Sequence, residues 1–183
     1  MLIAVVGPSG AGKDTLMGGA RAALAQDTRF RFVRRAITRP AEAGGEDHEA
    51  LNASAFAARQ EAGSFALFWE AHGLSYGIPR DIEADLAARR VVIANLSRAV
   101  LAEAGERYRL RVLQITAPIE VLATRLAARG REAPADIAAR LKREVTLPAG
   151  LDVESVSNDA DVAEGVARVL AALNRAASDA QGL

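Results

Sequence analysis

Leu2-Ile-Ala-Val-Val6 is an apolar run of strand length, and it leads directly into Gly7-Pro-Ser-Gly-Ala-Gly-Lys-Asp-Thr15. This second stretch fits the spacing GxxxxGK, and a helical pattern continues from Lys13 to Gln26. A strand, a glycine-rich loop and a helix in this order are the setting that a phosphate-binding loop requires. The glycines let backbone N–H groups point at phosphate oxygens, and the helix N-terminus adds partial positive charge.

The loop predicts binding of a nucleoside triphosphate, with Lys13 reaching its β- and γ-phosphates. The residues we expect to bind it are Gly7, Pro8, Ser9, Gly10, Ala11, Gly12, Lys13, Asp14 and Thr15. The residue after the lysine is normally a serine or threonine, but here it is an aspartate. A glycine-rich turn with an incidental lysine is the alternative reading. A dinucleotide site is excluded, because glycines at 7, 10 and 12 do not give GxGxxG.

Composition restricts the other function classes. The chain has 183 residues, the size of one domain, and its 23 basic residues balance 23 acidic ones. No overall positive field therefore attracts nucleic acid or anionic membranes. The absence of cysteine excludes disulfides, thiol nucleophiles and cysteine-ligated zinc, and two histidines are too few for a multi-histidine metal site. The apolar start is shorter than the ~18 residues of a membrane span, so we expect a cytoplasmic protein.

Lysine is scarce in this chain. Arginine accounts for 21 of the 23 basic residues, which leaves Lys13 and Lys142 as the lysines. A chain that uses arginine almost everywhere retains lysine in the glycine-rich loop, which indicates a requirement there for a compact ammonium on a flexible stem.

Strand-length apolar runs alternate with helical patterns along the chain. This alternation predicts an α/β fold, namely a P-loop kinase three-layer sandwich with a central parallel sheet. Residues 35–86 break the rhythm and predict an inserted acceptor-binding lobe, and 128–142 predict a small lid. The core of this single domain would comprise 1–34, 87–127 and 143–183. Besides residues 2–6, the runs cover 91–94, 110–115 and 153–156, and the helical patterns cover 54–61, 98–107, 119–129, 135–145 and 161–177.

Arginines gather just before and inside the predicted lobe, at positions 29, 31, 34, 35 and 39. Guanidinium forks suit phosphate oxygens, so the cluster is a candidate anion site in a chain of zero net charge. We expect Arg29 and Arg31 to lie on the solvent face of a strand. The alternating pattern Arg35-Ala-Ile-Thr-Arg39, next to Pro40 and a glycine turn, favours a binding role for Arg35 and Arg39.

Motifs along nearly the whole chain resemble one family. They are the glycine-rich loop, Ile37-Thr-Arg-Pro40, Trp69 to Gly77, Arg125 to Glu132, and Ser157-Asn-Asp159. The chain resembles the guanylate kinase family of P-loop kinases and, within it, the ribose 1,5-bisphosphate phosphokinases of phosphonate breakdown. The resemblance implies that Arg39 and Tyr76 hold acceptor phosphate and that Asn158 lies near the adenine. It also implies a lid that closes on ATP and carries Arg125, Arg129 and Arg140.

Departures from guanylate kinases concern the part of the site that reads the base. The family has a serine where Arg35 stands, a second arginine where Glu42 stands, and a phosphate-binding tyrosine where His48 stands. Its guanine-reading glutamate falls near Phe68, and a further serine is replaced by Ile78. A site built to hydrogen-bond a base cannot lose these groups cheaply. The departures favour a small acceptor with phosphate at both ends and no base.

The resemblance therefore implies transfer of phosphate from ATP to α-D-ribose 1,5-bisphosphate, giving ADP and 5-phosphoribosyl 1-diphosphate with the help of Mg²⁺. We expect Arg35, Arg39, His48 and Tyr76 to bind the acceptor. The groups expected at the transferring phosphate are Lys13, Arg39, Arg125, Arg129 and Arg140. Apart from the resemblance, the expectation for His48 and His72 is that both are polar residues on the surface.

For magnesium binding, we hypothesise that one carboxylate has been exchanged for another. Such kinases commonly have an acid at the end of a second strand, and here Asn95 stands there. Asp14 would approach the ion while Asn95 orients a water. The alternative is that Asp14 only favours the N-terminus of the following helix.

Two other functions stay open on sequence grounds. A nucleoside monophosphate kinase would share the donor site, and a base could still find polar partners among Glu46, Asp47, Glu70 and Ser75. A non-enzymatic scaffold of the guanylate kinase type would be expected to lose the phosphate loop, which this chain retains. The sequence leaves the oligomeric state open, with a homodimer as one option.

Overall fold

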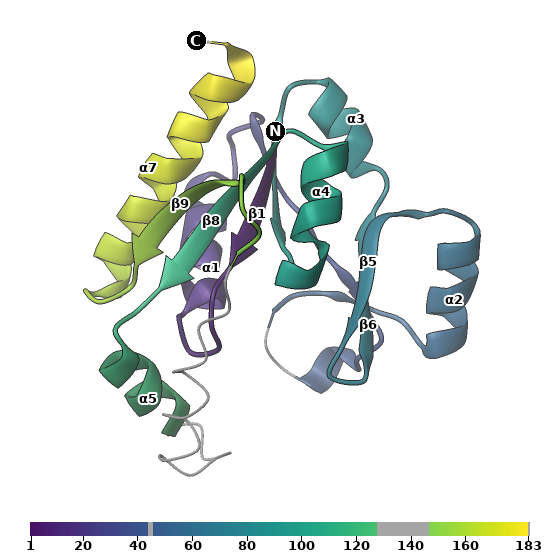
Figure 1. Cartoon of the computed structure of the whole chain (residues 1–183), viewed down its shortest axis with the longest axis horizontal. Coiled ribbons are helices and arrows are strands. Elements are labelled where there is room, and N and C mark those ends of the chain that lie inside the picture. Colours follow the sequence, from purple (N-terminus) through teal and green to yellow (C-terminus); the bar gives the residue numbers. More distant parts are fainter. Residues whose placement is uncertain (44–45, 128–146, 183) are drawn as a thin grey trace.

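The computed structural model of the chain describes residues 1–43, 46–127 and 147–182. Its centre is a parallel five-stranded sheet in the order β2-β7-β1-β8-β9 (Figure 1). The parallel sheet predicted from the apolar runs is confirmed. Its strands are β1 (Leu2–Val6), β2 (Phe30–Phe32), β7 (Val91–Asn95), β8 (Leu110–Thr116) and β9 (Asp152–Ser157).

Helices cover both faces of this sheet, as Figure 1 shows, and complete the three layers that the α/β pattern predicts. One face is covered by α1 (Lys13–Ala23) and α7 (Val162–Gln181). The opposite face is covered by α3 (Ile82–Ala87), η2 (Arg98–Val100) and α4 (Leu101–Arg107). A further helix, α5 (Ile119–Ala127), follows β8.

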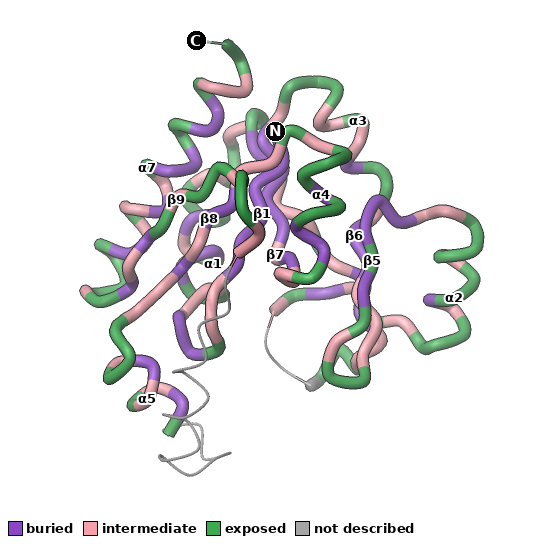
Figure 2. Tube along the Cα trace, viewed as in Figure 1, coloured by how far each residue is buried: buried purple, intermediate pink, exposed green. Residues whose placement is uncertain are grey.

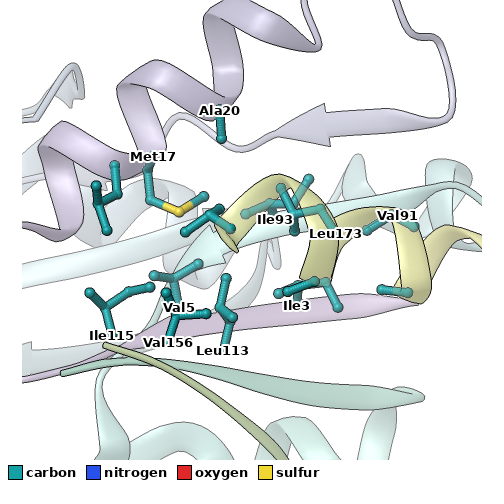
Figure 3. Close-up of a cluster of buried hydrophobic side chains, with 14 of the residues drawn as sticks. Ile3, Val5, Met17, Ala20, Val91, Ile93, Leu113, Ile115, Val156 and Leu173 are labelled. Carbon is teal, nitrogen blue, oxygen red and sulfur yellow. The ribbon is translucent and has the colours of Figure 1, made fainter. Parts of the chain in front are cut away.

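Side chains of the central strands alternate between two hydrophobic clusters. Ile3 and Val5 of β1 point into the cluster beneath α1 and α7, together with Leu173 (Figure 3). The intervening residues of β1 point into the cluster on the other face. All five residues of β1 are buried, and the inner strands form the most buried part of the chain (Figure 2). Because each fully buried aliphatic side chain contributes ~1.5–3 kcal/mol, β1 is firmly fixed between the two layers.

A second, four-stranded sheet lies within residues 35–86, with the order β4-β3-β6-β5. His72 and Gly73 form its hairpin turn with φ of 53° and 72°, which a two-residue hairpin loop of this kind requires. Phe56 stacks on Phe65 with ring centroids 4.7 Å apart. The elements of this region are β3 (Ala36–Ile37), η1 (Ala41–Ala43), β4 (Glu49–Ala50), α2 (Ala53–Glu61), β5 (Phe65–Ala71) and β6 (Leu74–Pro79).

Element ends differ from the sequence expectations at a few points. α1 ends at Ala23, three residues before the predicted Gln26, because the chain there enters a series of turns. α7 extends to Gln181, beyond the predicted end at 177, and stops where Gly182 adopts φ of 76°. β2 covers only Phe30–Phe32, so the strand expected around Arg29 and Arg31 includes Arg31 but not Arg29. The helix expected at 135–145 lies outside the described residues. None of the helices in the described ranges has the length and apolar character of a membrane span.

Candidate active site

The glycine-rich loop begins where β1 ends, at the carboxyl edge of the parallel sheet, where α/β proteins bind ligands. Gly7 has φ of 152°, and a Cβ there would lie 2.1 Å from the carbonyl oxygen of Ile115. Gly12 has φ of 83°, and a Cβ there would lie 2.3 Å from Nδ2 of Asn158. Neither position accepts a side chain, because the loop runs this close to β8 and to the segment after β9.

Lys13 opens α1 and folds back along the loop. Its Nζ donates to the carbonyl oxygens of Gly7 at 2.8 Å and Pro8 at 3.1 Å. Asp14 and Thr15 are exposed in the first turn of α1, and Gly12, the N-cap residue, provides no side-chain cap. The first backbone N–H groups of a helix have no intrahelical acceptor, so they are oriented to bind phosphate oxygens.

A cavity of about 230 Å³ adjoins the loop. It brings together the phosphate loop, the end of β7 and the second sheet, which are far apart in sequence. Six of the predicted site residues border this one space. Asn95 is among them because β7 pairs with β1, which places Asn95 opposite Val5. The lining residues are Val5, Lys13, Asp14, Arg35, Arg39, Glu46, Tyr76, Asn95 and Leu96.

Arg35 lies against two aromatic rings and one carboxylate. Its Cζ is 5.1 Å from the ring centroid of Tyr76 and 5.6 Å from that of Trp69. These two rings stack on each other with centroids 5.4 Å apart. Arg35 Nε donates to Oε1 of Glu46 at 2.7 Å, and Nη2 is 2.5 Å from the same oxygen. The guanidinium plane is therefore fixed by packing at the cavity wall.

His48 has a different place from the one predicted. We expected it either at the acceptor phosphate or on the surface, but it is only 4% exposed and does not line the cavity. Its Nε2 lies 3.1 Å from the carbonyl oxygen of Arg39, and its Nδ1 lies 3.0 Å from that of Glu46 and 3.3 Å from Nη2 of Arg39. A buried polar side chain needs such partners. His48 therefore positions Arg39, whereas His72 is exposed in the hairpin, as the surface alternative predicted.

Arg39 lines the cavity and has one side-chain donor that the described part of the chain leaves unused. Its Nε is buried and, among the described residues, has no hydrogen-bond partner. A buried donor without an acceptor is costly, so an anion that accepts this hydrogen bond gains affinity. Arg34 is different: it pairs with Asp47 at 2.9 Å, and this hydrogen bond holds the pKa of Asp47 below its usual value. Arg29 and Arg31 are also paired within the protein, Arg29 with Asp27 and Arg31 with Asp81 and Asp85.

Asp14, Glu46 and Asn95 are the residues with carboxylate or amide side chains that line the cavity. Asn95 Nδ2 donates to Oε2 of Glu46 at 2.8 Å, which leaves its Oδ1 as the acceptor end of the amide. Within the described ranges no group of three or more histidine, cysteine, aspartate or glutamate side chains forms a metal cluster. Magnesium usually takes one or two carboxylates together with substrate phosphates and water, so Asp14 and Asn95 fit such an ion bound with a nucleotide.

Asn158 is nearly buried, at 5% exposure, and its side chain faces the phosphate loop. Its Nδ2 donates to the carbonyl oxygen of Ala11 at 2.8 Å, and its backbone N donates to Thr116 at 2.8 Å. The amide expected near the adenine is therefore already engaged, and it fixes the curvature of the loop.

Arg125, at the end of α5, lies over the loop. Its Nη1 is buried without a hydrogen-bond partner among the described residues and is 3.8 Å from the position a Cβ would take at Gly12. This places a cation close to the donor phosphate site. Arg129 and Arg140, the other arginines expected there, lie outside the described residues, as does the predicted lid.

The positions that guanylate kinases use to read a base carry apolar groups without access to the cavity. Ile78 is completely buried in the core, and Phe68 is 46% exposed but does not line the cavity. Of the polar residues that the sequence left open for a base, Glu46 lines it, whereas Glu70 and Ser75 do not.

The sequence offered Glu46 only as one of four possible partners of a base and not among the residues expected to bind the acceptor. A larger hollow of about 500 Å³ adjoins the first cavity and shares Val5, Asp14, Glu46 and Asn95 with it. The signal was an acid beside a glycine turn and an arginine cluster, but the neighbouring Asp47 has the same signal and turns to Arg34 instead.

Curated relatives match the chain over most of its length. A protein named ribose 1,5-bisphosphate phosphokinase PhnN from Brucella melitensis is 52% identical over 162 residues, covering 87% of this chain and 84% of the relative. The protein of the same name from Agrobacterium fabrum is 45% identical over 182 residues, covering 98% and 100%. A bifunctional ribose 1,5-bisphosphokinase-thymidine phosphorylase from Azorhizobium caulinodans is 53% identical, and the chain spans 25% of its length. No protein-family profile matches the chain.

Solved structures share the fold at lower sequence identity. The guanylate kinase from Anaplasma phagocytophilum has a TM-score of 0.65 at 19% identity, covering 96% of this chain and 84% of that one. A gluconokinase from Sinorhizobium meliloti has a TM-score of 0.51 at 20% identity, covering 97% and 93%. Both likenesses concern the fold alone. The chain therefore belongs to the ribose 1,5-bisphosphate phosphokinase family and has the fold of guanylate kinase-like P-loop kinases.

Proposed function

We propose that this protein transfers the γ-phosphate of ATP to α-D-ribose 1,5-bisphosphate, giving ADP and 5-phosphoribosyl 1-diphosphate, as a step in phosphonate breakdown. The names of relatives at 45–53% identity support this assignment. Use of ATP as the donor supports a cytoplasmic location.

The cavity next to the phosphate loop is the observation that carries the proposal. Lys13 stands on its donor side, and Arg35, Arg39 and Tyr76 stand on the side of the second sheet. With Lys13 assigned to the donor, Arg35 and Arg39 supply two cations for the acceptor, which suits an acceptor that bears more than one phosphate. The apolar residues at the former base-reading positions, Phe68 and Ile78, offer nothing to a guanine edge.

Catalysis in this arrangement rests on alignment and charge neutralisation. The acceptor oxygen belongs to a phosphate that is already ionised at neutral pH, so no general base is needed. Lys13 and the N-terminus of α1 bind the donor phosphates, with Thr15 at the α-phosphate. Arg39 from the acceptor side and Arg125 from the donor side neutralise the transferring group.

Mg²⁺, when bound with ATP, neutralises charge on the donor phosphates. The carboxylate of Asp14 would face the ion directly or through water, and Asn95 would orient a water with its Oδ1. Support comes from their shared position on the cavity wall. Asp14 also lies in the first turn of α1, where an acid stabilises the helix N-terminus whether or not it binds magnesium. A magnesium titration of Asp14→Ala distinguishes these two roles.

Phosphorus NMR tests the reaction directly. The purified protein with magnesium and ATP is offered ribose 1,5-bisphosphate in one sample and a panel of nucleoside monophosphates in another. We expect a new diphosphate signal beside ADP in the first sample alone. Turnover of GMP or another monophosphate without turnover of the sugar bisphosphate would refute the proposal and assign a nucleoside monophosphate kinase.

A further inference from the structure

Glu46 is held from two sides at the boundary between the two hollows. Arg35 binds its Oε1, and Asn95 Nδ2 donates to its Oε2 at 2.8 Å. The side chain is 16% exposed, so it is mostly enclosed but still accessible from the cavity. Two fixed contacts leave it one defined orientation.

A carboxylate in this position repels phosphate, so it must face another part of an acceptor that carries two phosphates. Asp14 and Glu46 are the acids among the described residues that line the cavity. Asp14 is next to Lys13 on the donor side, whereas Glu46 is next to Arg35 on the acceptor side. Between its phosphates, a ribose bisphosphate has hydroxyl groups, which are hydrogen-bond donors.

The carboxylate of Glu46 has capacity for such donors. An ionised carboxylate offers about four lone-pair sites on its two oxygens. Arg35 engages one oxygen with both Nε and Nη2, and Asn95 engages the other with a single hydrogen bond. The oxygen shared with Asn95 therefore retains an acceptor site, and a hydroxyl bound there makes a charge-assisted hydrogen bond.

Building on the proposed function, we propose that Glu46 binds the ring hydroxyls of the acceptor sugar and is the residue that selects ribose over deoxyribose. It takes the place of base recognition: the cations bind the two phosphates, and this one acid reads the sugar between them. The bond from Asn95 keeps the carboxylate turned toward the substrate.

Steady-state kinetics with three acceptors tests the proposal. They are ribose 1,5-bisphosphate and its 2-deoxy and 3-deoxy analogues. Each is offered to the wild type, to Glu46→Gln and to the matched control Glu61→Gln, which changes an exposed acid at the end of α2. We expect Glu46→Gln to lower kcat/KM for ribose 1,5-bisphosphate roughly 10- to 100-fold, the range for a hydrogen bond to a charged group. For at least one deoxy analogue, namely the one that lacks the hydroxyl bound by Glu46, the same substitution should lower kcat/KM less than about threefold.

Other outcomes overturn the proposal. An equal loss on all three acceptors would make Glu46 a residue that only positions Arg35, and no loss on any of them would remove it from the site. Failure of the wild type to phosphorylate any of the three acceptors would instead refute the proposed function and this inference with it. Glu61→Gln should match the wild type on every acceptor.

Discussion

Replacing Asn158 by alanine tests whether this residue shapes the phosphate loop or contacts ATP. Its Nδ2 donates to the carbonyl oxygen of Ala11 over a sequence separation of 147 residues, at 2.8 Å, in a buried environment. Asn158→Ala removes this donor, and the carbonyl of Ala11 is left inside the protein without it. The loop would then lose its connection to the end of β9.

The cost follows from this one contact. A buried carbonyl left without its partner costs roughly 1–3 kcal/mol, so we take about 2 kcal/mol for the loss of unfolding free energy. A protein of this size changes its Tm by about 2–4 °C per kcal/mol, which predicts a decrease of about 4–8 °C. Asn174→Ala is the matched control, because its amide donates to the carbonyl of Leu170 on the exposed side of α7. We expect that variant to stay within about 0.5 kcal/mol of the wild type.

Thermal and denaturant unfolding without nucleotide are the measurements that decide. The denaturant midpoint should fall with an unchanged m-value, since the same surface is exposed on unfolding. The KM for ATP should rise as well, because a distorted loop presents its N–H groups poorly. If Asn158→Ala keeps the full stability of the nucleotide-free protein and changes only the KM for ATP, the side chain acts on the nucleotide and our reasoning is wrong.

Three further perturbations address the catalytic loop, the acceptor arginine and the core. Asp14→Ala should lower turnover roughly 10- to 100-fold and raise the Mg²⁺ concentration required, as measured by magnesium titration at saturating ATP; an unchanged titration would leave Asp14 with a helix-terminal role. His48→Ala should raise the KM for the acceptor roughly tenfold with little change for ATP, because Arg39 loses its support; equal changes in both would indicate general unfolding. Burial and a 2.8 Å hydrogen bond to Glu83 raise the pKa of Tyr108 to about 12. With an unfolded value near 10, the stabilisation is complete below pH 10 and is lost as the pH rises toward 12; after solvent screening we expect about 1 kcal/mol. Denaturant unfolding between pH 9 and 11.5 should show this loss in the wild type and not in Tyr108→Phe, and parallel losses would contradict it.

The sequence was sufficient for the parts of the fold whose signals are local. β1 begins and ends at the predicted residues because five consecutive apolar side chains bounded by a glycine are buried on both faces. The loop could be predicted for the same reason, since glycine spacing directly reflects backbone conformation. Helix ends were less certain, because α1 stops in a series of turns that no strong breaker marks.

Roles that depend on distant partners could not be predicted. His48 and Asn158 are polar residues whose burial arises from packing, and the resemblance to relatives assigned both of them directly to ligands. In the structure, their hydrogen bonds go to the backbone carbonyls of Arg39 and Ala11. Glu46 differs from Asp47 through its contact with Asn95, 49 residues away, which no local pattern encodes.

The different roles of lysine and arginine have a physical reason in this site. Lys13 must bend back along a tight loop, which a flexible stem and a compact ammonium allow, and its Nζ reaches two carbonyl oxygens of that loop. Arg35 must instead stay rigid, because its plane lies against the rings of Tyr76 and Trp69 and its fork holds one oxygen of Glu46. A lysine at position 35 would keep the charge but lose both the stacking and the two-pronged contact, so Glu46 would lose its fixed orientation. If the proposed acceptor site is right, its geometry depends on the shape of the guanidinium at position 35 and not on positive charge alone, so Arg35→Lys should weaken acceptor binding although the charge is kept.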